Sequence, residues 1–300
     1  MNVKFPDYQI PDNDDVQRLF HGRGHAWPGW EHIQIDWYAP VVVVMSFEPV
    51  EAEWLDALAQ HLKAHIPACE CILFQQRQRQ ETSHRWLLGE PCPDPVIEES
   101  GLRYQARLGR NQNTGFFPDM VNGRRWVQQH ASGKRVLNLF SYTCSFSVAA
   151  IAGGAERVVN MDMSKGALAT GRDNHRLNQQ SLDQVRFEAM NIFRSFGRLR
   201  RHGPFDLLVC DPPSFQKGSV NIQQDYRKIL KRIPEFMAPG SDLLLCLNHP
   251  SLGADFLYQE VSEHCPDAHF VERIANPEVL REATDTAGLK VLRFRYCPQP

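Results

Sequence analysis

The stretch RVLNLFSYTCSFSVAAIAGGAERVVNMDMS, residues 135–164, decides the fold. It begins with a β-type run, RVLNLF at 135–140, continues into a helix-type run at 144–152, and returns to a β-type run, RVVNMD at 157–162. A strand, a helix and a second strand in this order are typical of two parallel strands joined by a crossover helix. We therefore expect an open α/β sheet in this part of the chain.

The same alternation continues toward the C-terminus. We expect further strands at 185–190, 205–211 and 241–249, and helices at 165–178, 191–200, 222–238 and 253–264. Pro234 should kink or end the helix that contains it, because proline lacks a backbone donor. Two last strands, AHFVERIA and KVLRFRY, have no helix between them, which predicts an antiparallel pair. The predicted domain is a seven-stranded, doubly wound, Rossmann-like α/β sheet that binds ligands at the carboxyl ends of its strands.

The N-terminal part of the chain has a different pattern. Residues 1–30, which include HGRGHAWPGW, show no sustained period, and we interpret them as an irregular arm without an assigned role. Residues 31–112 predict a small α/β domain that ends in a hairpin with Gly101 near its tip. Within it we expect strands from Ile33 and near 69–77, and a helix near 52–65. Residues 113–300 are assigned to the sheet domain.

Composition limits the class of protein. The chain has 300 residues, no signal-peptide pattern and no apolar run of membrane-span length, so we expect a cytoplasmic protein without membrane contact. Its eight cysteines show neither a disulfide framework nor a zinc spacing, and no metal site is expected. The net charge is -2, so nucleic acid would have to bind at local basic clusters, which are more often ordinary solvated faces. The oligomeric state stays open, with a homodimer among the alternatives.

A turn suited to a nucleotide-type ligand follows the first strand of the sheet domain. Residues Phe140, Ser141, Tyr142 and Thr143 lead directly into a helix, whose first backbone amides attract anionic or polar ligand groups. Such turns are usually rich in glycine, but Cys144 and Ser145 stand at the expected positions. Taken alone, the turn is equally typical of an ordinary strand-to-helix connection.

Two further candidates follow the next two strands. Asp162 ends the second strand, where a carboxylate can accept both hydrogen bonds of a ribose diol. Because Ser164 follows closely, Asp162 is alternatively part of a helix cap. Asn191 follows the third strand, where its side chain could read an adenine, and a plain helix cap is an equal alternative.

The segment DPPSF, residues 211–215, is the strongest local motif. Pro212 and Pro213 stiffen the loop and remove two amide donors, so its carbonyl groups can face a ligand. Together with Asp211 they can accept hydrogen bonds from an amino or ring nitrogen, while Phe215 offers a face to a planar substrate. An ordinary Pro-Pro turn is the simpler alternative.

These motifs together resemble a known family, the bacterial large-subunit ribosomal RNA methyltransferases that make 5-methylcytosine or 7-methylguanine. The resemblance runs from about Val96 to the C-terminus and depends on NTGFFPD at 113–119, the stretch at 135–164, RDNHRLN at 172–178 and FDLLVCDPPSF at 205–215. It implies the class I methyltransferase fold, S-adenosylmethionine (SAM) as the cofactor and ribosomal RNA as the partner. The small α/β domain resembles the central domain of these enzymes, whereas the extra N-terminal RNA-binding module of some relatives is expected to be missing.

The resemblance also assigns roles to residues. The implied SAM-binding residues are Phe117, Asp119, Phe140, Ser141, Tyr142, Thr143, Asp162, Met163, Ser164, Asn191 and Asp211. The implied base-facing residues are Asp211, Pro212, Pro213, Ser214, Phe215 and Asn248. The family has small residues where this chain has Cys144 and Ser145, and an acidic residue where it has Asn191.

The same comparison favours one type of acceptor atom. Methylation of a pyrimidine carbon requires a cysteine nucleophile, because that carbon becomes nucleophilic only after a thiolate adds to the ring. The cytosine-modifying relatives carry this cysteine after the fifth strand, where the present chain has Leu247, Asn248 and His249, and the guanine-modifying relatives carry asparagine. Strand alternation should point the nearby Cys246 away from the position of Asn248. The interpretation is therefore transfer to a base nitrogen.

Two other functions remain as alternatives. An Asp-Pro-Pro turn also suits transfer to a protein amide or a small molecule. A catalytically silent protein that binds RNA or the ribosome would retain the same fold without the glycine-rich turn. A nicotinamide-dependent dehydrogenase is disfavoured because the chain lacks a G-x-G-x-x-G turn.

Overall fold

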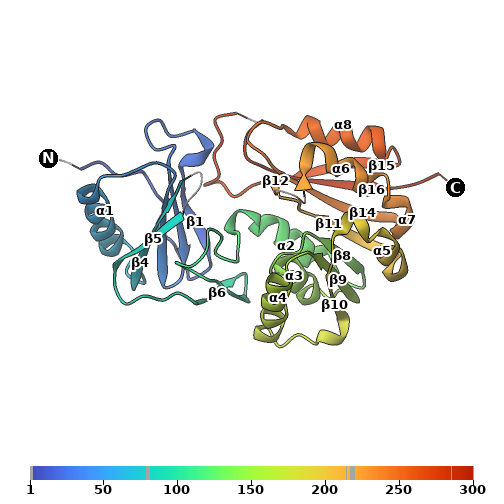
Figure 1. The fold of residues 1–300 in the computed structure, drawn as a ribbon, viewed down its shortest axis with the longest axis horizontal. Helices are drawn as coiled ribbons and strands as arrows, with labels where there is room; N and C mark the ends of the chain where they lie inside the picture. The colour runs from blue at the N-terminus through green and yellow to red at the C-terminus, as the bar shows by residue number, and fades with distance from the viewer. Residues whose placement is uncertain (1–2, 79–81, 214, 217–219, 285, 300) are drawn as a thin grey trace. The chain divides into compact units, whose positions relative to one another are not determined.

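The computed structural model describes residues 3–78, 82–213, 215–216, 220–284 and 286–299. The chain divides into two units, which we describe one at a time (Figure 1). The first unit comprises Met1–Val121 and Pro277–Ala283, and the second comprises Asn122–Asn276 and Thr284–Pro300. No helix among the described residues is both long enough and apolar enough to cross a membrane.

The first unit contains a five-stranded sheet in the order β1-β2-β3-β4-β5. Its elements are β1 (Gln17–His21), the short η1 (Gly22–Gly24), β2 (Ile33–Tyr38), β3 (Val41–Ser46), α1 (Ala52–His65), β4 (Cys71–Arg77) and β5 (Thr82–Leu88). Strands β3 and β4 run parallel because α1 connects them, and the other neighbours are antiparallel. The predicted hairpin forms from β6 (Val96–Glu99) and β7 (Leu102–Gln105), with Gly101 at its tip.

The segment expected to be an irregular arm contains β1, so that expectation was wrong for residues 17–21. Leu19 and Phe20 of β1 are buried in the core of the sheet. Arg18 lies opposite Asp36 of β2, and its Nε donates to Asp36 Oδ1 over 2.7 Å. A charged residue inside a strand interrupts the apolar pattern by which the strand would be recognised in the sequence. The burial of such a residue is tolerable only because a residue on the neighbouring strand carries the opposite charge.

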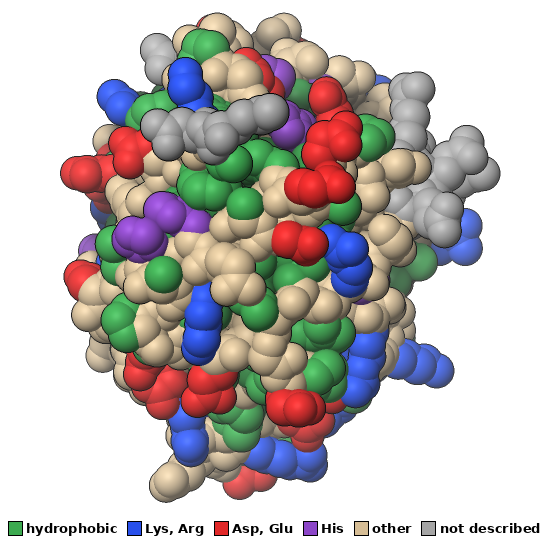
Figure 2. Space-filling model, turned by 90° about the vertical axis from the view of Figure 1, so that its left-hand side faces the viewer, with side chains coloured by type: hydrophobic (Ala, Val, Ile, Leu, Met, Phe, Trp, Pro, Cys, Tyr) green, Lys and Arg blue, Asp and Glu red, His purple; other side chains and the backbone are tan. Residues whose placement is uncertain are grey.

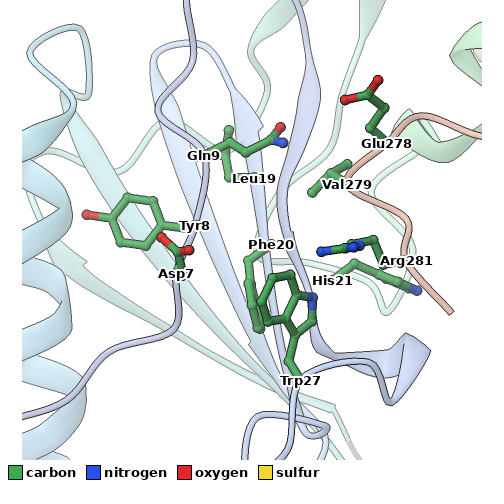
Figure 3. A pocket seen from close by; sticks show the side chains of 10 residues that line it. All are labelled: Asp7, Tyr8, Gln9, Leu19, Phe20, His21, Trp27, Glu278, Val279 and Arg281. Atoms are coloured by element: carbon green, nitrogen blue, oxygen red, sulfur yellow. The ribbon is translucent and has the colours of Figure 1, made fainter. Parts of the chain in front are cut away.

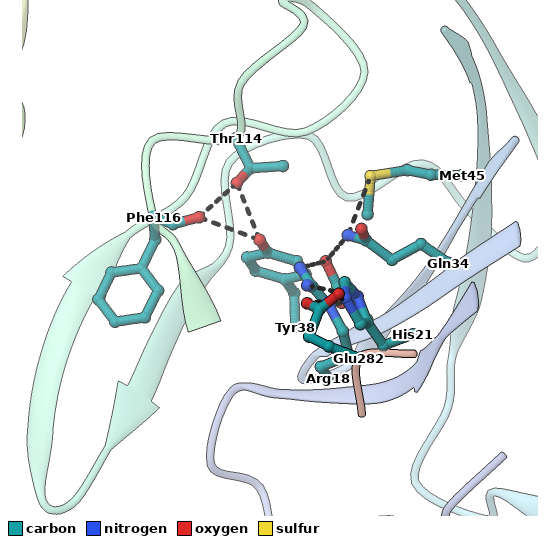
Figure 4. Close-up of polar contacts among 9 residues, drawn as sticks. Arg18, His21, Gln34, Tyr38, Met45, Thr114, Phe116 and Glu282 are labelled. Atoms are coloured by element: carbon teal, nitrogen blue, oxygen red, sulfur yellow. Dashed lines mark hydrogen bonds and ion pairs between the residues drawn. The ribbon is translucent and has the colours of Figure 1, made fainter. Parts of the chain in front are cut away.

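Polar contacts attach two distant segments to this sheet (Figure 4). His21 Nε2 lies 3.2 Å from Glu282 Oε1, and the backbone amide of Ala283 donates to the carbonyl of Gly24 over 2.7 Å. These contacts explain why residues Pro277–Ala283 belong to the first unit. The hydroxyl of Tyr38, which is fully buried, lies 2.9 Å from Thr114 Oγ1 and donates to the carbonyl of Phe116 over 3.1 Å. The NTGFFPD segment is therefore anchored to the end of β2.

The second unit contains the predicted seven-stranded sheet, in the order β10-β9-β8-β11-β14-β16-β15. Its strands are β8 (Arg135–Leu139), β9 (Arg157–Asp162), β10 (Val185–Ala189), β11 (Phe205–Cys210), β14 (Met237–Asn248), β15 (Ala268–Ile274) and β16 (Leu289–Tyr296). The first five strands in this order are parallel, and β16 and β15 close the sheet antiparallel. A separate two-stranded ladder pairs β12 (Phe215–Gln216) with β13 (Val220–Asn221). The predicted fold class is confirmed.

Helices lie on both faces of this sheet (Figure 1). They are α2 (Val121–His130), α3 (Ser145–Ala152), α4 (Lys165–Leu177), α5 (Phe196–His202), α6 (Ile222–Leu230), α7 (Ile233–Phe236) and α8 (Ala254–His264). Leu137 and Leu139 of β8 pack into one cluster with residues of α5 to α8. Asn138, between them, has the opposite orientation and begins a chain of buried hydrogen bonds toward α3 and α4. Pro234 ends the long predicted helix, because α7 starts anew with proline near its first position.

Candidate functional site

The carboxyl ends of the parallel strands bring most of the predicted residues of the second unit to one edge of the sheet. Cys210 of β11 is in register with Leu139 of β8 on one side and with Leu245 of β14 on the other. Ala189 of β10 is in register with Asp162 of β9. The turns that follow these strands carry the predicted residues, and in open α/β sheets this edge is where ligands bind.

The turn after β8 adopts left-handed backbone conformations that usually require glycine, although it contains no glycine. Phe140, Tyr142 and Cys144 all have positive φ, at 57°, 46° and 62°. A left-handed conformation costs a residue with a side chain roughly 1–2 kcal/mol, so neighbouring contacts must hold the turn in place. The amide of Ser141 donates to the carbonyl of Met161 over 3.2 Å, and the amide of Cys144 donates to the carbonyl of Ser141 over 2.7 Å.

A glycine that faces this turn lies on another helix. Gly171 of α4 packs so closely against Cys144 that a Cβ on Gly171 would lie 2.4 Å from Cys144 Sγ. Cys144 is fully buried in this contact, and its burial raises the pKa of the thiol well above the ordinary value. The side chain of Cys144 therefore occupies space that Gly171 provides. This arrangement explains how the chain accommodates a cysteine at a position where a small residue was expected.

Asp162 braces the same turn from β9. Its Oδ2 accepts a hydrogen bond from the amide of Tyr142 over 2.9 Å, and its Oδ1 accepts one from the amide of Ser164 over 2.8 Å. Ser164 itself caps α4, because its Oγ accepts from the amide of Ala167 over 3.1 Å. The cap of α4 is thus supplied by Ser164, and the carboxylate of Asp162 is directed to the turn after β8.

Two observations in this region fit a bound ligand that has both polar and apolar parts. The hydroxyl oxygen of Ser141 is buried without a hydrogen-bond partner among the described residues. Buried polar atoms in native proteins nearly always have a partner, so an orphaned one at a strand end indicates a group that the ligand would satisfy. Met163 and Met190 are also large apolar side chains left 51% and 38% exposed. Met190 was not among the predicted residues, and its exposure is a property of the fold that no sequence pattern contains.

Asn191 adopts the role of a helix cap. Its Oδ1 accepts a hydrogen bond from the amide of Phe193 over 2.9 Å, at the start of the short helix η4 (Ile192–Arg194). The alternative that the sequence left open is therefore present in the structure. A side-chain oxygen that is engaged in this way is less available to an adenine, although the amide nitrogen of Asn191 is a hydrogen-bond donor.

The Asp-Pro-Pro turn follows β11. Asp211 is half-buried, Pro212 is buried and Pro213 is exposed. Ser214 lies outside the described residues, as does the side chain of Phe215. The turn extends from a rigid base, because the buried hydroxyl of Tyr226 donates to the carbonyls of both Cys210 and Cys246, over 3.3 and 3.2 Å.

Asn248 is exposed at the end of β14. The buried ammonium group of Lys290 lies on the neighbouring strand, β16, and donates to the carbonyls of His249 over 3.2 Å and of Gly288 over 2.8 Å. Lys290 thus holds the chain directly after Asn248, a function that the sequence did not predict. Cys246 lies two residues before Asn248, hence on the same face of the strand, but it has no exposed surface. Burial, and not the direction of the strand, separates its thiol from the position of Asn248.

Phe117 and Asp119 belong to the first unit, where they begin the short helix η2 (Pro118–Met120). Phe117 is 43% exposed. One carboxylate oxygen of Asp119, Oδ1, is buried and has no hydrogen-bond partner among the described residues. Both side chains therefore have the features of ligand-contacting groups within their own unit.

Comparison with known proteins identifies the family. A family model described as S-adenosylmethionine-dependent methyltransferase matches residues 17–295. The chain belongs to this family. SAM is accordingly the cofactor of this methyltransferase.

Individual relatives agree with the family model. Ribosomal RNA large subunit methyltransferase I of Aeromonas salmonicida is 30% identical over 281 residues, which cover 89% of this chain and 69% of the relative. The protein of the same name from Photobacterium profundum is 31% identical over 273 residues, covering 85% and 67%. A methyltransferase solved in complex with SAH has a TM-score of 0.83 at 24% identity, covering 94% of this chain and 75% of that one. This last likeness supports the fold.

Proposed function

We propose that this methyltransferase transfers a methyl group from SAM to a nitrogen of a base in large-subunit ribosomal RNA, of the 7-methylguanine type. The RNA substrate is supported by the printed names of relatives that are 30% and 31% identical over most of the chain. The nitrogen acceptor is supported by one observation, the exposed Asn248 at the end of β14.

The chemistry of the acceptor explains why Asn248 matters. A ring nitrogen of guanine has a lone pair that can attack a methyl group directly, so neither a covalent adduct nor a thiolate is needed. A cytosine carbon needs a thiolate, but Cys246 and Cys210 at the ends of the two central strands are fully buried. Burial also raises the pKa of the Cys210 thiol, which further disfavours the thiolate.

We assign the binding of SAM to the edge formed by β8, β9 and β10. Asp162 would accept hydrogen bonds from the ribose diol, and the Ser141 hydroxyl would gain the partner that it lacks. The other proposed contacts within the second unit are Phe140, Tyr142, Thr143, Met163, Ser164, Asn191 and Asp211. SAM supplies an activated methyl group on a sulfonium centre.

The base would lie against the Asp-Pro-Pro turn. The backbone carbonyl groups of Asp211, Pro212 and Pro213 would accept hydrogen bonds from amino groups of the base. Their task is to orient the acceptor lone pair for an in-line approach, and orientation of this kind accounts for much of the rate of such reactions. The Tyr226 hydroxyl keeps the ends of β11 and β14 together and so supports both Asp211 and Asn248.

The test measures transfer of labelled methyl groups to ribosomal RNA, followed by mass spectrometry of the nucleosides. The expected product is 7-methylguanosine, whereas 5-methylcytidine would refute the nitrogen acceptor and label in protein alone would refute the RNA substrate. Asp211→Ala should slow turnover by about 100-fold, far more than it weakens SAM binding.

Three further variants separate the possible acceptors and test the cofactor site. Asn248→Ala should slow turnover, and Cys246→Ser should not, because a buried thiol takes no part in transfer to nitrogen. Asp162→Ala should weaken SAM binding by at least about tenfold, since hydrogen bonds to a charged group contribute roughly 1.5–3 kcal/mol. Loss of activity in Cys246→Ser with an unchanged melting temperature would contradict the proposed chemistry.

A further inference from the structure

The N-terminal stretch that the methyltransferase chemistry does not use surrounds a cavity. The cavity has a volume of about 490 Å³ and lies wholly within the first unit. Figure 3 shows its walls, which come from residues 7–9, from β1, from the HGRGHAW stretch and from the segment 278–281. Small-molecule and cofactor sites have volumes of this order.

One wall of the cavity is aromatic. Phe20 and Trp27 contact each other, with ring centroids 6.1 Å apart and planes inclined by 45°. The guanidinium group of Arg281 lies 5.5 Å from the centroid of the Trp27 ring, and in Figure 3 it points toward Phe20. Trp27 is half-buried, so part of its indole remains open to a ligand. Aromatic rings beside an arginine form the usual surface on which unpaired RNA bases stack.

Several polar side chains that line the cavity have hydrogen-bond donors and acceptors available to a ligand. Arg281 is a donor, Asp7 is an acceptor and the Gln9 amide is both, and all three residues are exposed. Within the described part of the chain, none of these side chains forms a hydrogen bond or an ion pair with another residue. Glu278 adds a second carboxylate to the lining. A ligand with acceptors on one edge and donors on another would satisfy these groups.

We propose that this cavity binds one unpaired guanine nucleotide of the RNA substrate, an inference that depends on the proposed action on RNA. Guanine presents two acceptors, O6 and N7, which arginine recognises with two parallel hydrogen bonds. Its N1 and N2 are donors, which suit a carboxylate such as that of Asp7. No other base of RNA combines two adjacent acceptors with two adjacent donors in this way.

One observation argues against a peptide that would extend the sheet as an added strand. A peptide that adds to the sheet would need the free edge of β1, but the amide of Gln9 already donates to the carbonyl of Leu19 over 2.9 Å. Charges of both signs are interspersed on the face of the molecule shown in Figure 2, so no broad field of one sign attracts RNA there. Without such electrostatic attraction, binding of RNA at this face would depend on the recognition of a single base by stacking and hydrogen bonds.

The experiment labels the 300-residue chain with 5-fluorotryptophan and follows the tryptophan resonances during titration with GMP, AMP, CMP and UMP. Trp27→Phe identifies the resonance of Trp27 among those of the six tryptophans. We expect GMP at millimolar concentration to shift this resonance in a saturable way, and the other nucleotides to bind about tenfold more weakly. An unchanged Trp27 resonance, or equal affinity for all four nucleotides, would overturn the proposal.

Matched variants locate the contacts. Arg281→Ala and Asp7→Asn should each weaken GMP binding by about tenfold, while Arg186→Ala and Asp12→Asn, at exposed positions outside the cavity, should not. A shift of Trp27 by a lysine-rich peptide without a shift by GMP would assign the cavity to a protein partner and overturn the proposal. Methyl transfer to ribosomal RNA is measured separately. Transfer without GMP binding overturns only the cavity proposal, and GMP binding without transfer overturns only the proposed function.

Discussion

Gly171→Ala tests whether the turn after β8 depends on space provided by α4. An alanine Cβ at this position would lie 2.4 Å from Cys144 Sγ and 2.9 Å from Cys144 Cβ. Neither distance is tolerated between carbon or sulfur atoms, so either the helix or the turn must move. Because Cys144 has no exposed surface, its side chain cannot rotate into solvent to relieve the contact.

The magnitude follows from two opposing effects. Overpacking of a buried site costs about 1–3 kcal/mol. Alanine gains about 1 kcal/mol over glycine inside a helix, which offsets part of this cost. The net loss of folding stability is therefore small, on the order of 1 kcal/mol. SAM binding should respond more strongly, by about tenfold or more, since displacement of a binding turn by a fraction of an ångström disturbs several ligand contacts together.

The assay is a double-mutant cycle with Cys144→Gly, read by calorimetric SAM affinity and by thermal unfolding. Cys144→Gly removes both atoms that the alanine meets, and glycine adopts the φ of 62° without strain. In the double variant SAM affinity should recover most of the loss, with a coupling energy of about 1–2 kcal/mol. Gly197→Ala is the control, because nothing lies within 4 Å of a Cβ added at Gly197. If Gly171→Ala binds SAM normally, or if the double variant is no better than Gly171→Ala, the reasoning is refuted.

Three further predictions concern groups that support the site. Tyr226→Phe should lower the free energy of unfolding by about 1–3 kcal/mol in urea titrations, because two buried carbonyls lose their donor. Lys290→Met should reduce turnover and leave the calorimetric SAM affinity unchanged, and equal loss of both would argue against a local role for Lys290. Burial lowers the pKa of His175 to about 4, so between pH 6.5 and 4 the unfolded chain binds the additional proton and the folded protein loses roughly 3 kcal/mol as the pH falls. His175→Gln should show a smaller difference in unfolding free energy between pH 7 and pH 4.5, and an unchanged difference would contradict this assignment.

The strands of the second unit could be predicted from the sequence, but the buried hydrogen bonds that end at His175 could not. The strands β8 and β9 are apolar enough to be identified from sequence, and their observed ends agree with the predicted ones within one residue. Asn138 and Asn160 interrupt these runs, and each is fully buried. Asn160 accepts from Asn138 over 2.9 Å and donates to Ser147 Oγ, which in turn lies 2.9 Å from His175 Nε2. Such a chain is satisfied only when strands and helices are already packed, so no local pattern predicts it.

In the first unit, contacts between residues far apart in the sequence also determine secondary structure, and one strand was missed for this reason. The strand β1 was missed because Arg18 interrupts its apolar pattern and is balanced by Asp36, which is 18 positions away in the sequence. The strand β5 and the helix α2 were not predicted either. For the candidate site, the strand ends placed Asp162, Asp211 and Asn248 correctly at the carboxyl edge of the sheet, because parallel strands bring their carboxyl ends to one edge whatever the side chains are. Which groups face a ligand and which cap a helix, as Asn191 does, depends on contacts outside the motif.

In the turn after β8, residues other than glycine take over what a glycine-rich turn usually provides. A glycine-rich turn combines two properties, a left-handed backbone and room for close approach, and one residue usually supplies both. Here the two properties are separated: Phe140, Tyr142 and Cys144 have the left-handed backbone, held by Asp162 and by Met161, while Gly171 supplies the room. Because the side chains at positions 144 and 171 share one space, their combined volume is limited. Related chains should therefore be able to exchange the small residue between these two positions, and a variant that is large at both should lose the turn.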